Sequence, residues 1–213
     1  MILPTGHYTE QAKGWPAQGR CILAHYDAQS IVVYQAYRPA IARHVLAHGA
    51  FGGDFSFSRM SWIKPNFLWM MYRSGWGLKP DQEMTLGLRL RRAFFEDILA
   101  RAVASTFAAS GYADMEEWKH AIARSEVRLQ WDPDHGPGGE PLERRAIQLG
   151  LRGETLRAFG TRELLEVIDL TDFVAGERER LSREGVGQLR MPIECVFRPQ
   201  DESVARRLGL ASE

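Results

Sequence analysis

The feature that most limits the fold of this chain is the stretch of residues 59–77, RMSWIKPNFLWMMYRSGWG. It holds three of the six tryptophans, three of the seven methionines and three basic residues. Pro65 cannot lie inside a regular helix but suits a first helical turn, and Gly75 favours a helix end. These breaks place the three tryptophans on a strand, a short helix and a loop, not on one helix face: Trp62, Trp69 and Trp76.

Strands and helices alternate irregularly along the rest of the chain. Strands are expected where β-branched and aromatic residues gather or polarity alternates: 20–26, 30–37, 55–59, 84–90, 127–131, 145–151 and 188–197. The first two could form a hairpin. Helices are expected where apolar residues recur at helical spacing: 39–48, 66–73, 94–107, 115–122, 154–159 and 162–181, the last with a possible break at 169–172.

This order favours an α+β fold, with a mixed or antiparallel sheet flanked by helices, over a doubly wound α/β sheet. The length of 213 residues suits one domain. We expect that domain over residues 20–200, with a loose N-terminal arm over 1–19 and a C-terminal tail over 201–213.

The overall charge of the chain is balanced, with 27 basic and 27 acidic residues. No global field therefore attracts nucleic acid or an anionic membrane. The two cysteines, Cys21 and Cys195, argue against a disulfide scaffold and fit a reducing compartment. We find no signal-peptide pattern and no apolar run near the roughly 18 residues of a membrane span. These features predict a soluble cytoplasmic protein without a membrane partner.

The charge is nevertheless uneven, because residues 59–92 contain seven basic and two acidic side chains. Core segments rarely carry so many cations. Arg59, Lys64 and Arg73 are spaced through the tryptophan-rich stretch, and we expect them to form an anion-binding wall with most of the aromatic and methionine side chains packed behind it. The alternative is that this stretch is simply an unusual core.

Familiar catalytic motifs are missing from the sequence. It has no phosphate-binding loop, no dinucleotide-binding glycine fingerprint, no nucleophile elbow and no His-Glu-x-x-His. The pair His44 and His48 is explained by a solvated helix face, and Asp132, Asp134 and His135 by acidic turn chemistry. We therefore predict no metal site.

Polar residues inside otherwise apolar strands either form buried hydrogen bonds within the fold or line a pocket. Eight residues fall in such places: Tyr34, Gln35, Ser58, Gln130, Trp131, Asp132, Gln148 and Glu194.

Four segments resemble the domain-of-unknown-function family 4291 of bacteria and fungi. They are residues 34–37 (YQAY), 59–77, 130–133 (QWDP) and 147–151 (IQLGL). The resemblance runs from about residue 20 to residue 197, and the central motif is long and compositionally rare. The family name carries no activity with it.

The order of elements also resembles the layout of the ADP-ribosyltransferase fold. That layout implies a first strand that carries Arg or His, a later strand that carries Ser or an aromatic residue, and a late strand that carries an acidic residue. Its matches here imply catalytic residues at three positions: Arg20 (or His25), Ser58, and either Gln148 or Glu194. Gln148 and Glu194 are alternatives for the late acidic position.

The same resemblance implies NAD, or a related nucleotide-like molecule, as ligand, with action at the glycosidic bond. Arginine suits a pyrophosphate and an aromatic ring suits the nicotinamide. The residues expected to bind it are Tyr34, Gln35, Arg59, Trp62, Lys64, Tyr72 and Arg73. Two other functions stay open: binding or processing of nucleic acid, through stacked bases and held phosphates, and a non-catalytic interaction module.

Overall fold

The computed structural model describes residues 3–210, and its twelve strands and eight α-helices form an α+β fold. The strands are β1 (Thr5–His7), β2 (Gly19–Arg20), β3 (Leu23–Ala24), β4 (Ser30–Tyr37), β5 (Ser61–Ile63), β6 (Met84–Arg91), β7 (Val103–Ala104), β8 (Val127–His135), β9 (Pro141–Leu151), β10 (Leu164–Asp169), β11 (Arg190–Pro192) and β12 (Cys195–Val196). The α-helices are α1 (Tyr8–Ala12), α2 (Pro39–His48), α3 (Phe67–Ser74), α4 (Arg92–Arg101), α5 (Met115–Arg124), α6 (Gly153–Gly160), α7 (Thr171–Glu184) and α8 (Glu202–Leu208). The fold class agrees with the prediction.

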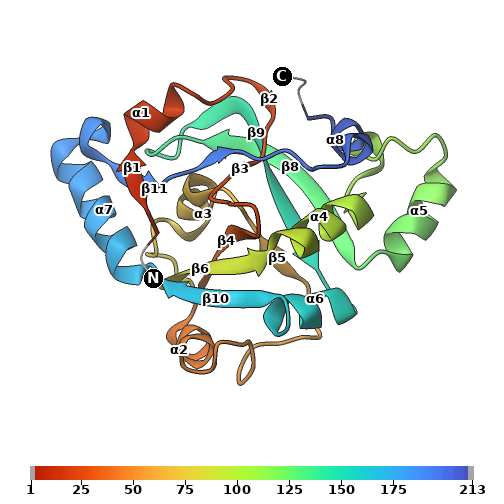
Figure 1. Ribbon diagram of the computed structural model, residues 1–213, viewed down its shortest axis with the longest axis horizontal. Helices are drawn as coiled ribbons and strands as arrows, with labels where there is room; N and C mark the ends of the chain where they lie inside the picture. Colours follow the sequence, from red (N-terminus) through yellow and green to blue (C-terminus); the bar gives the residue numbers. More distant parts are fainter. Residues whose placement is uncertain (1–2, 211–213) are drawn as a thin grey trace.

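Two sheets form the centre of the molecule (Figure 1). The first is antiparallel with the order β10-β6-β4. The second has the order β2-β9-β8-β7, and β5 also pairs with β9. The sheets meet where the Tyr34 amide donates to the Lys64 carbonyl at 2.6 Å. The middle of β4 is thereby held against the end of β5.

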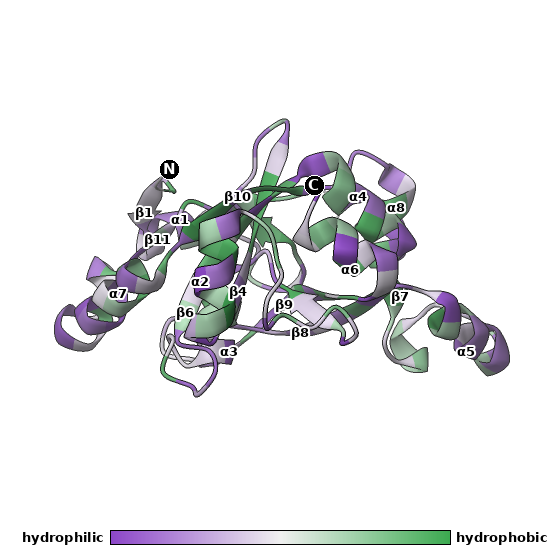
Figure 2. Ribbon diagram, turned by 90° about the horizontal axis from the view of Figure 1, so that it is seen from below, coloured by the Kyte–Doolittle hydropathy of each residue, from purple (hydrophilic) through white to green (hydrophobic). Residues whose placement is uncertain are grey.

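Two hydrophobic clusters fill the space around the sheets. The larger contains the apolar faces of β4, β6, β8 and β9 together with α4 and α6. The smaller surrounds α3, where Phe67 and Met71 are fully buried against Tyr34 and Leu189. Figure 2 shows α7 as largely hydrophilic, and Figure 1 places α7 and α5 at opposite ends of the long axis. The core therefore lies in the middle, beside the junction of the two sheets.

Several predicted elements are confirmed, most closely in the first half of the chain. Strand β4 covers the predicted residues 30–37, and α2 begins at Pro39 and ends before Gly49, which has a left-handed φ of 66°. Helix α3 begins after Asn66, whose side chain accepts from the Trp69 amide at 2.7 Å, and Gly75 ends it in the left-handed region. As predicted, the tryptophans lie on β5, on α3 and in the turn after it.

Other elements differ from the prediction. Residues 55–59 are a loop, because Phe55 packs against Phe51 at a centroid distance of 4.4 Å and is not part of a sheet. The predicted hairpin is reduced to one bridge between Tyr26 and Ile31, since the main partner of β4 is β6. Residues 188–197 form two short strands, β11 and β12, instead of one.

The expected helix over 162–181 divides into β10 and α7 at the break noted at residues 169–172. Strand β10 pairs with the edge of β6, and Glu166 forms an ion pair with Arg89 at 2.9 Å. Pairing with the open edge of β6 thus favours a strand over residues 164–169, although the local sequence pattern is helical.

Residues 3–19 and 201–210 are more ordered than the expected arm and tail, whose outermost residues, 1–2 and 211–213, lie outside the described part of the chain. Strand β1 pairs with β11, and Arg144 donates to the Pro16 carbonyl at 2.8 Å while forming a buried ion pair with Asp134 at 2.7 Å. At the other end α8 buries Val204 and Leu208 in the main core. Contacts with residues distant in the sequence order both segments, and such contacts cannot be predicted from local composition.

Candidate functional site

A pocket of about 470 Å³ opens where the two sheets meet. It is lined by the end of β4, by β5, by inner residues of β8 and β9, and by α3. Four of the lining side chains are glutamines, and we call the site the glutamine pocket: Gln35, Gln82, Gln130 and Gln148. The lining also includes five residues that the sequence predicted for a site: Gln35, Trp62, Lys64, Arg73 and Gln148.

One wall of the pocket is formed by two glutamine amides that share a carboxylate lying behind the lining. Gln130 on β8 is the direct cross-strand partner of Gln148 on β9. Side chains two apart on a strand share a face, so Asp132 projects to the same side as Gln130. Its two oxygens accept hydrogen bonds from Gln130 Nε2 at 2.9 Å and from Gln148 Nε2 at 2.6 Å. Both glutamines are therefore oriented by a fixed negative charge.

Trp62 reaches the pocket because its strand partner is a glycine. Trp62 on β5 pairs with Gly150 on β9. A Cβ atom at Gly150 would lie 2.6 Å from the Met60 sulfur and 3.0 Å from the Trp62 ring. The glycine thus lets both side chains lie flat across the strand beside the glutamines.

The opposite wall comes from β4. Gln35 Nε2 donates to Ser61 Oγ at 2.8 Å and to the Trp62 carbonyl at 2.9 Å. The Tyr37 hydroxyl donates to Gln35 Oε1, and it lies 3.4 Å from Ser61 Oγ. Burial raises the pKa of the Tyr37 phenol, so this group is a hydrogen-bond donor and not a phenolate at neutral pH.

Lys64 lies at the end of β5, beside both walls, and it is 5% exposed. Its Nζ donates to the Trp62 carbonyl at 3.2 Å and lies 5.0 Å from the centroid of the Trp69 ring. Burial, assisted by the charge of Arg73, lowers its pKa to about 7, while Asp132 acts in the opposite direction. A lysine at this position is partly a neutral amine at physiological pH.

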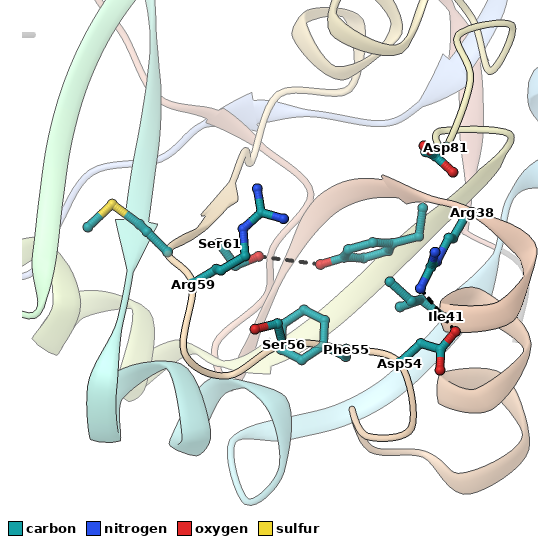
Figure 3. A pocket seen from close by; sticks show the side chains of 10 residues that line it. Arg38, Ile41, Asp54, Phe55, Ser56, Arg59, Ser61 and Asp81 are labelled. Atoms are coloured by element: carbon teal, nitrogen blue, oxygen red, sulfur yellow. Dashed lines mark hydrogen bonds and ion pairs between the residues drawn. The ribbon is translucent and has the colours of Figure 1, made fainter.

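A second pocket of about 350 Å³ adjoins the first and shares Tyr37, Met60 and Ser61 with it. Figure 3 shows Arg38 and Asp54 joined on one side, at 3.0 Å, and Arg59 on the other. Arg59, predicted for an anion site, therefore lines this second pocket. The predicted anion wall is divided, with Lys64 and Arg73 in the glutamine pocket.

Three of the other predicted residues lie outside both pockets in positions that serve the fold. Tyr34 is fully buried and packs on Phe67 at a centroid distance of 5.4 Å. Glu194 is also buried, between β11 and β12, where its Oε1 accepts from the Phe67 amide at 2.8 Å at the start of α3. Arg20 donates to the Leu208 carbonyl at 3.0 Å and holds the C-terminal helix.

The remaining two predicted residues are exposed. Ser58 lies in the loop over 55–59, where its hydroxyl is 2.9 Å from that of Ser56. Tyr72 stacks on His135, with ring centroids 3.4 Å apart, on the side of α3 away from the pocket lining. The strand that carries a serine beside an aromatic residue is β5, with Ser61 and Trp62, and not the segment around Ser58.

The structure also adds pocket residues that the sequence did not single out: Tyr37, Ser61 and Gln82. Tyr37 and Ser61 each lie within two residues of a predicted position, Gln35 and Trp62 respectively. The strand pattern could therefore have identified both of them. Gln82 lies in the loop before β6, and only the tertiary structure brings it to the site. The polar and aromatic part of the lining consists of four amides, two aromatic side chains, one serine hydroxyl and two basic groups.

Within residues 3–210, no group of three or more His, Cys, Asp or Glu side chains has the geometry of a metal site. His44 and His48 stack on each other at a centroid distance of 4.1 Å on α2. No α-helix in that range has both the length and the apolar character that a membrane crossing requires.

Comparison with known proteins agrees with the resemblance seen in the sequence. A family model described as a domain of unknown function (DUF4291) matches residues 21–197, most of the chain. No curated protein matches the chain.

Proposed function

We propose that this chain, which belongs to the DUF4291 family, is an ADP-ribosyltransferase-like enzyme that binds NAD or a related nucleotide in the glutamine pocket and acts at its glycosidic bond. The observation that supports the proposal is a convergence of side chains. Gln35, Trp62, Arg73 and Gln148 come from four separate elements, yet they line one pocket at the junction of two sheets.

Each kind of side chain in the lining suits one part of a nucleotide. The Trp62 ring offers a face on which a planar base or nicotinamide can stack. The glutamine amides can donate to and accept from ribose hydroxyls and a carboxamide. Arg73 is exposed at the rim, where a guanidinium can take two phosphate oxygens at once. Arg59 in the adjoining pocket offers a second such group to a longer ligand.

Cleavage of a glycosidic bond passes through an oxocarbenium-like, positively charged sugar, which an adjacent negative charge stabilises. Behind the lining of the glutamine pocket lies the carboxylate of Asp132, which accepts hydrogen bonds from the lining residues Gln130 and Gln148. We propose that Asp132 supplies the negative charge that the ADP-ribosyltransferase layout places on a late strand. Gln148 holds the Asp132 carboxylate in place through its hydrogen bond. Glu194 is then a fold residue, because it caps α3 outside the pocket.

The test is binding followed by turnover. NAD should raise the melting temperature of the protein, and Trp62→Ala and Arg73→Ala should each remove most of that rise. Arg124→Ala is the matched control, because Arg124 is exposed on α5 at the far end of the molecule. Release of nicotinamide, followed by chromatography, then measures the reaction itself.

The alternatives give different results in the same experiment. No thermal response at millimolar NAD would contradict the proposal. Salt-dependent retention of labelled single-stranded RNA or DNA, without a response to NAD, would instead favour a nucleic-acid protein. A response to neither would favour an interaction module.

A further inference from the structure

We infer that the Lys64 side-chain amine is a carbonyl-reactive group, which forms an imine with a small aldehyde or ketone bound in the glutamine pocket. The inference is independent of the nucleotide proposal, because it depends on a different atom, Lys64 Nζ, and on a different reaction.

The surroundings of Lys64 are those of an uncharged amine. The side chain is 5% exposed and lines the pocket, and its Nζ has one hydrogen bond, to the Trp62 carbonyl at 3.2 Å. Between residues 3 and 210, no carboxylate lies within 4 Å of it to form an ion pair. A buried ammonium without a close counter-charge is costly, so the neutral form is favoured.

The charged groups near Lys64 agree with this picture. Arg73 on α3 and burial both lower its pKa, which falls to about 7, and Asp132 on β8 opposes them. Near pH 7 about half of the molecules then carry the free amine, whereas an ordinary lysine with a pKa of 10.5 carries it in fewer than about one molecule in a thousand. Such an amine is a nucleophile at neutral pH.

Imine formation at this position balances without an oxidant or a cofactor. The nitrogen lone pair attacks the carbonyl carbon, and a proton moves from nitrogen to the carbonyl oxygen to give a carbinolamine. The hydroxyl then leaves as water together with the second amine proton, which gives the neutral imine, and the imine nitrogen takes up one proton from solvent. The carboxylate of Asp132, fixed by Gln130 and Gln148, favours the resulting cation electrostatically.

The pocket also limits the class of carbonyl compound. Its volume of about 470 Å³ holds a small molecule, and Lys64 shares the lining with the polar side chains of Gln35, Gln130 and Gln148. Arg73 lies on the same lining and suits a phosphate or carboxylate. We therefore expect an aldehyde or ketone that bears an anionic group.

Pyridoxal 5′-phosphate, an aldehyde with a phosphate, is a direct probe. The protein is incubated with it at pH 7, reduced with borohydride, digested and mapped by mass spectrometry. The chain has only four lysines, so every site can be quantified: Lys13, Lys64, Lys79 and Lys119. The expected result is labelling mainly at Lys64, although it is the buried one.

A pH series sharpens the test. From pH 7 to pH 9 the rate at Lys64 should rise only about 2-fold, whereas an exposed lysine should gain about 10-fold per pH unit. Lys64→Met should lose the label and Lys119→Arg should keep it, with circular dichroism checking the fold of both. Labelling of the exposed lysines with Lys64 unmodified in the native protein would overturn the inference, whether or not the Lys64→Met variant folds.

Discussion

Gln148 Nε2 lies 2.6 Å from Asp132 Oδ2, across the antiparallel pair of β9 and β8. Gln130 also donates to Asp132, so two side chains that line the pocket are both held by this one carboxylate. An amide that donates to a carboxylate is oriented by it, so the opposite end of the Gln148 amide presents a carbonyl oxygen at a defined position.

Removing this amide should weaken both the fold and the site. Gln148→Ala leaves Asp132 with one of its two donors, and the loss of a hydrogen bond to a charged group costs about 1–3 kcal/mol of unfolding free energy. Urea denaturation measures the change. Gln188→Ala, at an exposed position, should stay within about 0.5 kcal/mol of the wild type. Equal stability of the two variants would contradict the assigned role of Gln148.

Gly150 should tolerate no side chain. A Cβ atom would approach the Met60 sulfur and the Trp62 ring to 2.6 and 3.0 Å, so Gly150→Ala should displace both toward the pocket. We expect a loss of roughly 1–3 kcal/mol, together with a shift in tryptophan fluorescence.

The control for Gly150→Ala is a glycine substitution that should change the stability in the opposite direction. Gly176→Ala, inside α7 and with open space around its Cβ position, should stabilise the protein by about 0.5–1 kcal/mol. A thermal melt distinguishes the two variants, and a neutral effect of Gly150→Ala would show that Trp62 is free to move.

Lys64 should make stability depend on pH in a defined direction. Its pKa is about 7 in the folded protein against an ordinary 10.5, so the unfolded chain binds more protons between these values. Stability relative to Lys64→Met should therefore rise with pH from about 7 to 10, by at most about 1.4 kcal/mol per pH unit. Urea titrations at pH 7 and 9 measure it, and exposed Lys119→Met should show no such slope.

Glu194 should behave as a neutral hydrogen-bonding group. Burial raises the pKa of its carboxyl well above the ordinary 4.5, although the Phe67 amide partly opposes this. Glu194→Gln should therefore cost less than about 1 kcal/mol at neutral pH, whereas Glu194→Ala should cost roughly 2–4 kcal/mol, because it leaves a cavity and an unpaired amide.

The pH dependence separates these two effects. A carboxyl with a raised pKa contributes its full stability below pH 4.5, and that contribution declines as pH rises toward the folded-state pKa. Wild type should thus lose stability relative to Glu194→Gln as pH increases from 4.5 to 7. A loss of catalysis by Glu194→Gln with unchanged stability would instead place Glu194 in the reaction.

Local sequence determined much of this protein. Pro39 and Gly49 limit α2, Asn66 and Gly75 limit α3, and alternating polarity marks β6, because caps and strand periodicity depend on neighbours only a few residues away. The same local signals placed Gln35 and Gln148 on strands and separated the three tryptophans. The α+β class followed from these patterns, whereas the family was indicated by the resemblance of residues 34–37, 59–77, 130–133 and 147–151 and shown by the match of the family model.

Only the tertiary structure decided which of the predicted polar residues meet. Glu194 and Arg20 read as site residues, yet long-range pairing sends the first to the start of α3 and the second to the end of α8. The junction of β4 with β5, a hydrogen bond between residues 34 and 64, brings Gln35, Lys64 and Gln148 to one pocket. Burial there, and not residue type, sets the protonation of Lys64, because the pKa of an amine depends on the solvent and charges that the fold places around it.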